Sequence, residues 1–139
     1  MEIKWCWRCQ MEIPMLDKEE FRLCREAIKG GKKLVEEQRK NRNIENYEWL
    51  GEIPKPYERL RYFIDMYRLI TGFEETNPNA IWHHVIDEYG EDCPNCKKPL
   101  RTKKARYCVA CGFGKEDFTS ADTKPLVERR PELFIRKNE

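Results

Sequence analysis

Apolar residues recur every three or four positions over three stretches of the chain and predict three helices. The first begins at Asp17, a favoured N-cap residue, with Glu20 three positions later as its capping-box partner. Gly30 and Gly31 lie inside this stretch, where they either break the helix or let another part of the backbone approach closely. The polar residues 36–43 follow as a solvated helix end and linker. The apolar stripe of this helix comprises Phe21, Cys24, Ala27, Ile28, Gly31, Leu34 and Val35.

The other two predicted helices are shorter, and proline and glycine mark their ends. One covers residues 57–71, with Gly72 in the position of its C-cap. The next covers residues 77–89, because Pro78 suits the first helical turn and Gly90 follows the last one. Its apolar face would consist of Ile81, Trp82, Val85, Ile86 and Tyr89.

The chain is short and heavily charged, with 139 residues of which 40% are apolar and 37% are charged. This composition leaves a modest core, which a cross-link of some kind would stabilise. The net charge of +2 does not by itself indicate a nucleic-acid or membrane partner. No apolar run approaches the roughly 20 residues that span a bilayer, and the N-terminus lacks the apolar segment of a secretory signal. We therefore expect a cytoplasmic protein, in which cysteines serve as thiols or metal ligands.

Two C-x-x-C pairs lie toward the C-terminus, separated by eleven residues: Cys93 with Cys96, and Cys108 with Cys111. Two tight turns of this kind aim four thiolates at one ion and provide the tetrahedral shell that zinc prefers. The pattern predicts a zinc-ribbon β-hairpin over residues 91–114. Its zinc ion would be structural, because four protein ligands leave no position for a catalytic water. Gly112 follows the second pair as in other zinc ribbons, whereas Lys97 stands where the first pair often has glycine.

The segment between the two pairs is basic and contains no acidic residue. Its cations could contact phosphates, which would make residues 97–106 a nucleic-acid or anion-binding surface. Alternatively, they offset the formal charge of −2 on a zinc ion with four thiolates. The cations are Lys97, Lys98, Arg101, Lys103, Lys104 and Arg106.

A third pair, Cys6 and Cys9, lies near the N-terminus. A thioredoxin-like redox motif must follow a strand inside a βαβ unit, and only five residues precede this pair, so we reject that interpretation. Two thiolates need further ligands, and the remaining His and Cys residues are His83, His84 and Cys24. Because Cys24 lies on an apolar stripe, we interpret it as a core residue. We predict that Cys6, Cys9 and His83 or His84 hold a second zinc ion. The alternatives are ordinary surface histidines, or a zinc-dependent enzyme with an open coordination position at this pair.

These features predict an α+β fold that is mainly α, with a three-helix body, a C-terminal zinc-ribbon β-hairpin and an N-terminal cysteine knuckle. The expected division is a helical domain over 1–90, the ribbon over 91–114 and a tail over 115–139. An apolar cluster, residues 133–135, lies in the tail. The sequence contains no phosphate-binding loop, dinucleotide-binding, nucleophile-elbow or metalloprotease motif, and it indicates no small-molecule substrate. We therefore do not expect an enzyme.

Residues 71–84, continuing through the cysteine pairs to Gly112, resemble a group of small bacterial zinc-ribbon proteins, with an asparagine-rich turn and a His-His pair. The opening Cys6-Trp7-Arg8-Cys9 and residues 14–17 are also similar to theirs. Some of these proteins belong to toxin–immunity loci, in which a small cytosolic protein blocks a delivered toxin. The resemblance implies a zinc-binding immunity protein that neutralises a bacterial toxin by binding it. The alternative function is a nucleic-acid-binding zinc-ribbon module that uses residues 97–106.

Overall fold

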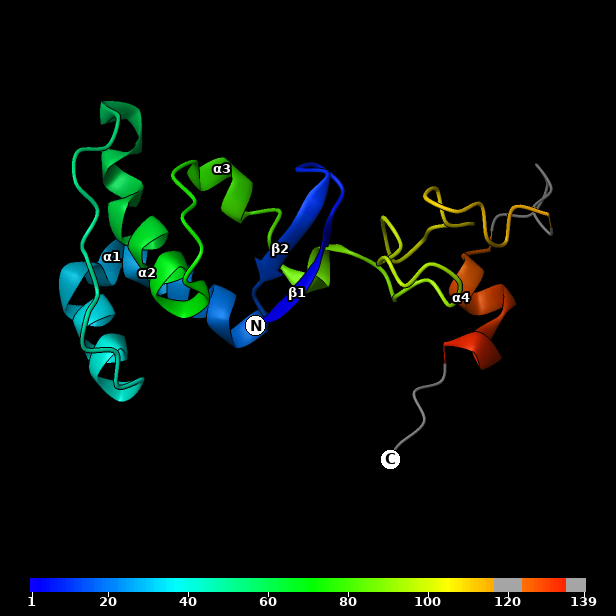
Figure 1. Cartoon of the computed structure of the whole chain (residues 1–139), viewed down its shortest axis with the longest axis horizontal. Coiled ribbons are helices and arrows are strands. Elements are labelled where there is room, and N and C mark those ends of the chain that lie inside the picture. Colours follow the sequence, from blue (N-terminus) through cyan, green and yellow to red (C-terminus); the bar gives the residue numbers. More distant parts are fainter. Residues whose placement is uncertain (117–123, 135–139) are drawn as a thin grey trace. The chain divides into compact units, whose positions relative to one another are not determined.

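The computed structural model describes residues 1–116 and 124–134, which form helices and one two-stranded antiparallel sheet (Figure 1). The strands are β1 (Glu2–Cys6) and β2 (Met11–Met15). The α-helices are α1 (Lys18–Asn41), α2 (Arg61–Thr71), α3 (Pro78–Ile81) and α4 (Leu126–Arg129). Short 3-10 helices cover Lys55–Leu60, Ile86–Glu88 and Pro131–Leu133. Within the described ranges, no helix is both long and apolar enough to cross a membrane.

The described residues form two compact units. The helical unit consists of Met1–Ile3 and Ile13–Ile86 and contains α1, α2 and α3. The cysteine unit consists of Lys4–Glu12 and the described residues from Asp87 onward. It contains all three C-x-x-C pairs, so the N-terminal pair belongs to the same unit as the two C-terminal pairs. The domain boundaries predicted from the sequence, 1–90, 91–114 and 115–139, instead place the N-terminal pair with the helices.

Helix α1 begins as its sequence predicts. An Asp17 carboxylate oxygen accepts a hydrogen bond from the Glu20 N–H at 2.8 Å, and a Glu20 carboxylate oxygen accepts one from the Asp17 N–H at 3.0 Å. This reciprocal pair is the predicted capping box. In the middle of the helix, Gly31 adopts a φ of 62° and produces a kink. The ring of Tyr62 lies 3.8 Å from the place where a Cβ at Gly31 would be, so the glycine allows a kink and a close aromatic contact together.

Helices α1 and α2 pack side by side around the core of the helical unit (Figure 1). Three residues of the predicted stripe, Cys24, Ala27 and Val35, are fully buried. Gly72 ends α2 with a left-handed φ of 71°, which confirms its prediction as the C-cap. The buried cluster contains Leu16, Cys24, Ala27, Val35, Phe63, Ile64, Met66, Tyr67, Leu69 and Ile81.

Polar contacts attach the segment after α1 to helix α2. The Tyr47 hydroxyl donates to the Asp65 carboxylate at 2.6 Å, and the Leu50 N–H donates to the same oxygen at 3.3 Å. The Arg61 guanidinium donates to the Leu50 carbonyl oxygen at 2.6 Å. Asp65 has no solvent exposure, so the two donors to its Oδ1 replace hydrogen bonds that water would otherwise supply to that oxygen. Its Oδ2 has no hydrogen-bond partner among the described residues.

The predicted helix over 77–89 is wrong beyond its first turn. α3 ends at Ile81, and a backbone bridge pairs Leu16 with Val85 in parallel. The Leu16 N–H donates to the His84 carbonyl oxygen at 2.8 Å, and the Ile86 N–H donates to the Leu16 carbonyl oxygen at 2.9 Å. The backbone of Leu16 therefore provides the hydrogen bonds for His84 and Ile86 that a continued helix would have formed within itself.

The predicted β-hairpin over 91–114 is also not observed, because these residues fold as turns with one isolated antiparallel bridge between Asp92 and Pro99. The small core beneath the turns contains Cys93, Leu100, Cys108 and Leu126. Leu126 belongs to α4, so the segment predicted as a tail contributes to the core of the cysteine unit. In the predicted apolar cluster of the tail, Phe134 packs against this core, and Ile135 lies outside the described residues.

Candidate metal centres

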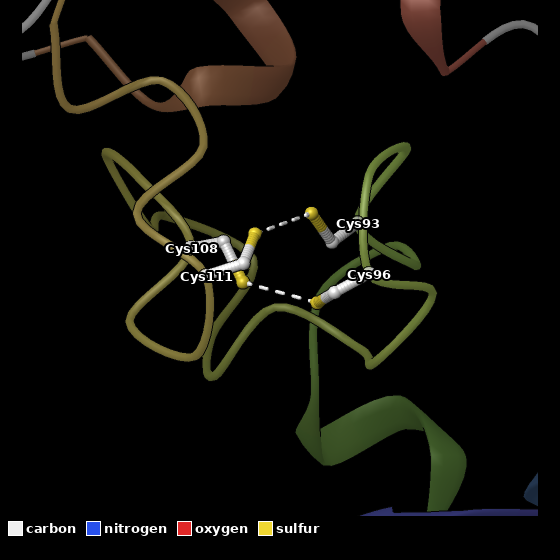
Figure 2. Close-up of side chains that lie close together, drawn as sticks. All are labelled: Cys93, Cys96, Cys108 and Cys111. Carbon is white, nitrogen blue, oxygen red and sulfur yellow. Dashed lines mark hydrogen bonds between the residues drawn. The ribbon is translucent and has the colours of Figure 1, made fainter.

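The four C-terminal cysteines lie on two turns that face one another, with their side chains directed toward a common centre (Figure 2). The Sγ atoms of Cys93 and Cys111 are 3.7 Å apart, and those of Cys96 and Cys108 are 3.6 Å apart. All four sulfurs lie within 4.8 Å of one another. A tetrahedron with Zn–S bonds of about 2.3 Å has sulfurs about 3.8 Å apart. The cluster therefore fits a zinc ion with four thiolate ligands.

The two turns share the same backbone geometry. The Lys97 N–H donates to the Cys93 carbonyl oxygen at 2.9 Å, and the Gly112 N–H donates to the Cys108 carbonyl oxygen at 2.7 Å. The residue after each pair is left-handed, with φ of 69° at Lys97 and 80° at Gly112. Lys97 therefore adopts the conformation for which other zinc ribbons use glycine, at a cost of roughly 1 kcal/mol for its Cβ.

The thiols of this cluster occupy different electrostatic environments. Burial raises the pKa of Cys108 to about 12, and it also raises the pKa of Cys93. A hydrogen bond from the Asn95 side chain lowers the pKa of the exposed Cys111 to about 6. Because burial opposes ionisation of two of the four thiols, a cation at the centre would be needed for all four to be thiolates.

The N-terminal segment packs against the first of these turns within the cysteine unit. The Lys98 ammonium lies 3.9 Å from the centre of a Trp5 ring, and the Trp7 indole N–H donates to the Pro99 carbonyl oxygen at 2.9 Å. These contacts support the turn that carries Cys93.

The basic residues of the segment 97–106 lie mostly on the surface, but some already have partners. Lys97 donates to the Pro94 carbonyl oxygen at 3.1 Å, Lys98 lies over Trp5, and Lys103 pairs with Asp87 at 3.1 Å. The exposed members of the segment are Lys97, Arg101, Lys103, Lys104 and Arg106.

Cys6 and Cys9 form the second cysteine-rich site that could hold a metal ion. The Gln10 N–H donates to the Cys6 carbonyl oxygen at 2.8 Å, and Gln10 is left-handed with a φ of 55°. Cys6 is fully buried, and its sulfur lies 3.4 Å from the Tyr89 hydroxyl. The backbone of this turn therefore repeats the geometry of the other two C-x-x-C turns.

The two histidines have different surroundings in the helical unit. His84 is fully buried, and its Nδ1 lies 3.1 Å from the Tyr67 hydroxyl oxygen. Burial, together with the neighbouring His83, lowers the pKa of His84 to about 4. His83 is half-buried. The alternative of two ordinary surface histidines is thus wrong for His84.

Sequence reasoning did not identify Tyr67 and Tyr89 as residues beside candidate ligands. Both lie at apolar positions of predicted helices, so their hydroxyl groups gave no separate signal. Cys24, by contrast, is a buried core residue as predicted, and burial raises its pKa well above the ordinary range of a thiol.

Comparison with protein families, curated proteins and solved structures found no match to this chain.

Proposed function

We propose that this chain is a non-enzymatic zinc protein that binds a protein partner. The observation that carries the proposal is an exposed aromatic surface on the helical unit. Trp82 is 39% exposed and stacks on the buried ring of Phe63, with ring centres 5.2 Å apart and an interplanar angle of 26°. Phe21 and Trp82 form a T-shaped contact with ring centres 5.2 Å apart, and the Arg25 guanidinium lies 5.1 Å from the centre of the Phe21 ring.

Tryptophan and arginine are enriched among the residues that contribute most to binding at protein interfaces. A tryptophan fixed between two aromatic rings has already lost much of its rotational freedom, so partner binding immobilises it at a lower entropic cost. The aromatic surface of Phe21, Arg25 and Trp82 therefore has the composition and the rigidity of a binding surface.

The zinc ion of the Cys93 cluster has a structural role in this proposal. Four thiolate ligands leave no coordination position for a substrate or a catalytic water. The ion would hold together a set of turns whose own apolar core is small.

The most concrete form of the proposal is an immunity protein that neutralises a bacterial toxin. It rests on the resemblance of residues 71–112 and of the N-terminal segment to proteins of toxin–immunity loci. With 37% charged residues, the complex should be sensitive to salt.

The test is co-expression with a toxin-like protein encoded immediately upstream of this chain. We expect rescue of growth and a stable complex on size-exclusion chromatography. Trp82→Ala should weaken the complex by at least about 2 kcal/mol, roughly 30-fold in Kd. Val109→Ala, which removes an exposed apolar side chain elsewhere, serves as the matched control and should leave Kd unchanged. Absence of both rescue and complex would refute the immunity role, and equal binding by the two variants would refute the proposed surface.

The second candidate is nucleic-acid binding by residues 97–106, which is favoured by the exposed cations of that segment. Single- or double-stranded DNA or RNA should then bind at low salt and be released steeply as salt rises. The double variant Arg101→Glu/Lys104→Glu should abolish binding and leave the zinc content unchanged. A chain that binds none of these nucleic acids at low salt would exclude this function.

A further inference from the structure

The four cysteines of the C-terminal cluster differ in how far solvent reaches each side chain. Cys93 and Cys108 are buried, Cys96 is half-buried and Cys111 is exposed. A hollow of about 330 Å³ lies beside Cys111, with Asn95 also in its lining. A small molecule in solvent can therefore reach the Cys111 sulfur while the sulfurs of Cys93 and Cys108 stay covered.

Contacts within the cysteine unit hold Cys111 against the turn that carries Cys93. The Sγ atoms of Cys93 and Cys111 are 3.7 Å apart (Figure 2). The Asn95 side chain, on the turn of Cys93, donates a hydrogen bond to the Cys111 sulfur. The exposed sulfur is therefore in close contact with a buried sulfur of the opposite turn.

The same cluster thus contains an accessible thiolate and a second thiolate placed to react with it. Thiolates are the nucleophilic form of cysteine, and peroxides oxidise them most readily where they are exposed. We propose that Cys111 is a site of oxidation by peroxide, and that the product is a disulfide with Cys93. This inference rests on the four-thiolate zinc cluster of the proposed function and adds a means of emptying it.

The oxidation takes place in two balanced steps. The Cys111 thiolate attacks one oxygen of hydrogen peroxide, so that an S–O bond forms, the O–O bond breaks and hydroxide leaves; the product is a sulfenic acid. The Cys93 thiolate then attacks the Cys111 sulfur, so that an S–S bond forms, the S–O bond breaks and a second hydroxide leaves. Two thiolates lose two electrons in total, and one peroxide is reduced to two hydroxide ions.

The disulfide changes the cluster because its sulfurs are no longer thiolates. The site keeps only Cys96 and Cys108 as ligands and loses its affinity for zinc. Since the apolar core beneath these turns is small, their fold should be lost with the ion. A thiol reductant reverses the disulfide by exchange, so added zinc should then restore the cluster.

The first experiment treats the reduced, zinc-loaded full chain with hydrogen peroxide, blocks the remaining thiols and maps tryptic peptides by mass spectrometry. Peptide 107–115 should become linked through Cys111 to Cys93 in peptide 69–97, and one zinc ion per chain should be released. In the presence of dimedone, a trap for sulfenic acids, Cys111 should be the first of the four cysteines to be labelled. Earlier labelling of Cys93 or Cys108, or a disulfide from Cys111 to Cys108, would overturn the proposal.

The second experiment compares two variants with the same ligand set, Cys111→His and Cys96→His. Three thiolates and one imidazole still suit zinc, and metal analysis of each reduced variant checks that it is loaded. Peroxide should release zinc from Cys96→His as from the wild type, whereas Cys111→His should keep it. Equal release from the two variants would refute Cys111 as the point of attack. The first experiment needs no substitution, so it decides the question even if a variant binds no zinc.

The zinc content of the reduced wild type tests the proposed zinc function separately. A reduced chain that holds no zinc refutes that function, while a disulfide between Cys93 and Cys111 in the same chain still supports the oxidation site. A loaded chain whose Cys111 stays reduced while other cysteines of the cluster are oxidised supports the zinc and refutes the oxidation site.

Discussion

Removal of zinc from the four-cysteine cluster should unfold the turns around it. In the core of these turns, the fully buried aliphatic side chains are Leu100 and Leu126. Each contributes about 1.5–3 kcal/mol by burial, so the two together supply about 3–6 kcal/mol. A structural zinc ion supplies about 10–16 kcal/mol at neutral pH. The metal is therefore the larger contribution, and residues 93–111 should lose their fold without it.

Hydrogen exchange read by mass spectrometry, with and without a chelator, measures this effect. Peptides from residues 93–111 should lose protection when metal analysis shows that the zinc has been removed. Peptides from α1 and α2, which have their own apolar core, serve as the reference. Cys108→Ser should cause the same loss of protection in residues 93–111 without a chelator. Cys24→Ala, which changes a cysteine outside the candidate metal sites, should not. Unchanged protection of 93–111 in zinc-free protein would refute the reasoning.

Three further changes test local features. Gly90→Ala places a Cβ too close to the Thr102 carbonyl oxygen and should lower the free energy of unfolding by about 1–3 kcal/mol in urea denaturation. Gly51→Ala, with open space around it, should stay within about 0.5 kcal/mol, and equal midpoints for the two variants would contradict the close approach. Lys97→Gly should relieve the strain of the left-handed backbone and tighten zinc binding by about 1 kcal/mol in chelator competition. Weaker zinc binding by this variant would contradict that strain. Tyr47→Phe removes the 2.6 Å hydrogen bond to the buried Asp65 carboxylate and should lower the free energy of unfolding by about 1.5–3 kcal/mol. An unchanged midpoint of thermal unfolding would argue against that hydrogen bond.

The predictions from sequence that succeeded rest on local chemistry. The capping box at Asp17 and Glu20, and the C-cap at Gly72, depend on hydrogen bonds and backbone angles within a few residues. The spacing of the four C-terminal cysteines likewise restricts their thiolates to nearly one arrangement around an ion. Such features are present in the chain whatever it later packs against.

The predictions that failed depend on distant segments. The helix expected over 77–89 is replaced after Ile81 by backbone pairing with Leu16, a partner that helical periodicity does not reveal. The burial of Leu126 beside Cys93 and Cys108 also joins positions far apart in the sequence. In both cases the gain from hydrogen bonding or burial exceeds the local preference, because propensities are worth only tenths of a kcal/mol per residue.

The order of the residues alone reveals three C-x-x-C pairs, a capped first helix and a four-thiolate cluster suited to zinc. It does not reveal that His84 is buried with its Nδ1 against Tyr67, or that the N-terminal cysteines lie on a turn of the same geometry as the others. The difference lies in the range of the interactions. Ligand spacing and capping act within one turn of chain, whereas burial and the choice of a histidine tautomer depend on residues that folding brings together.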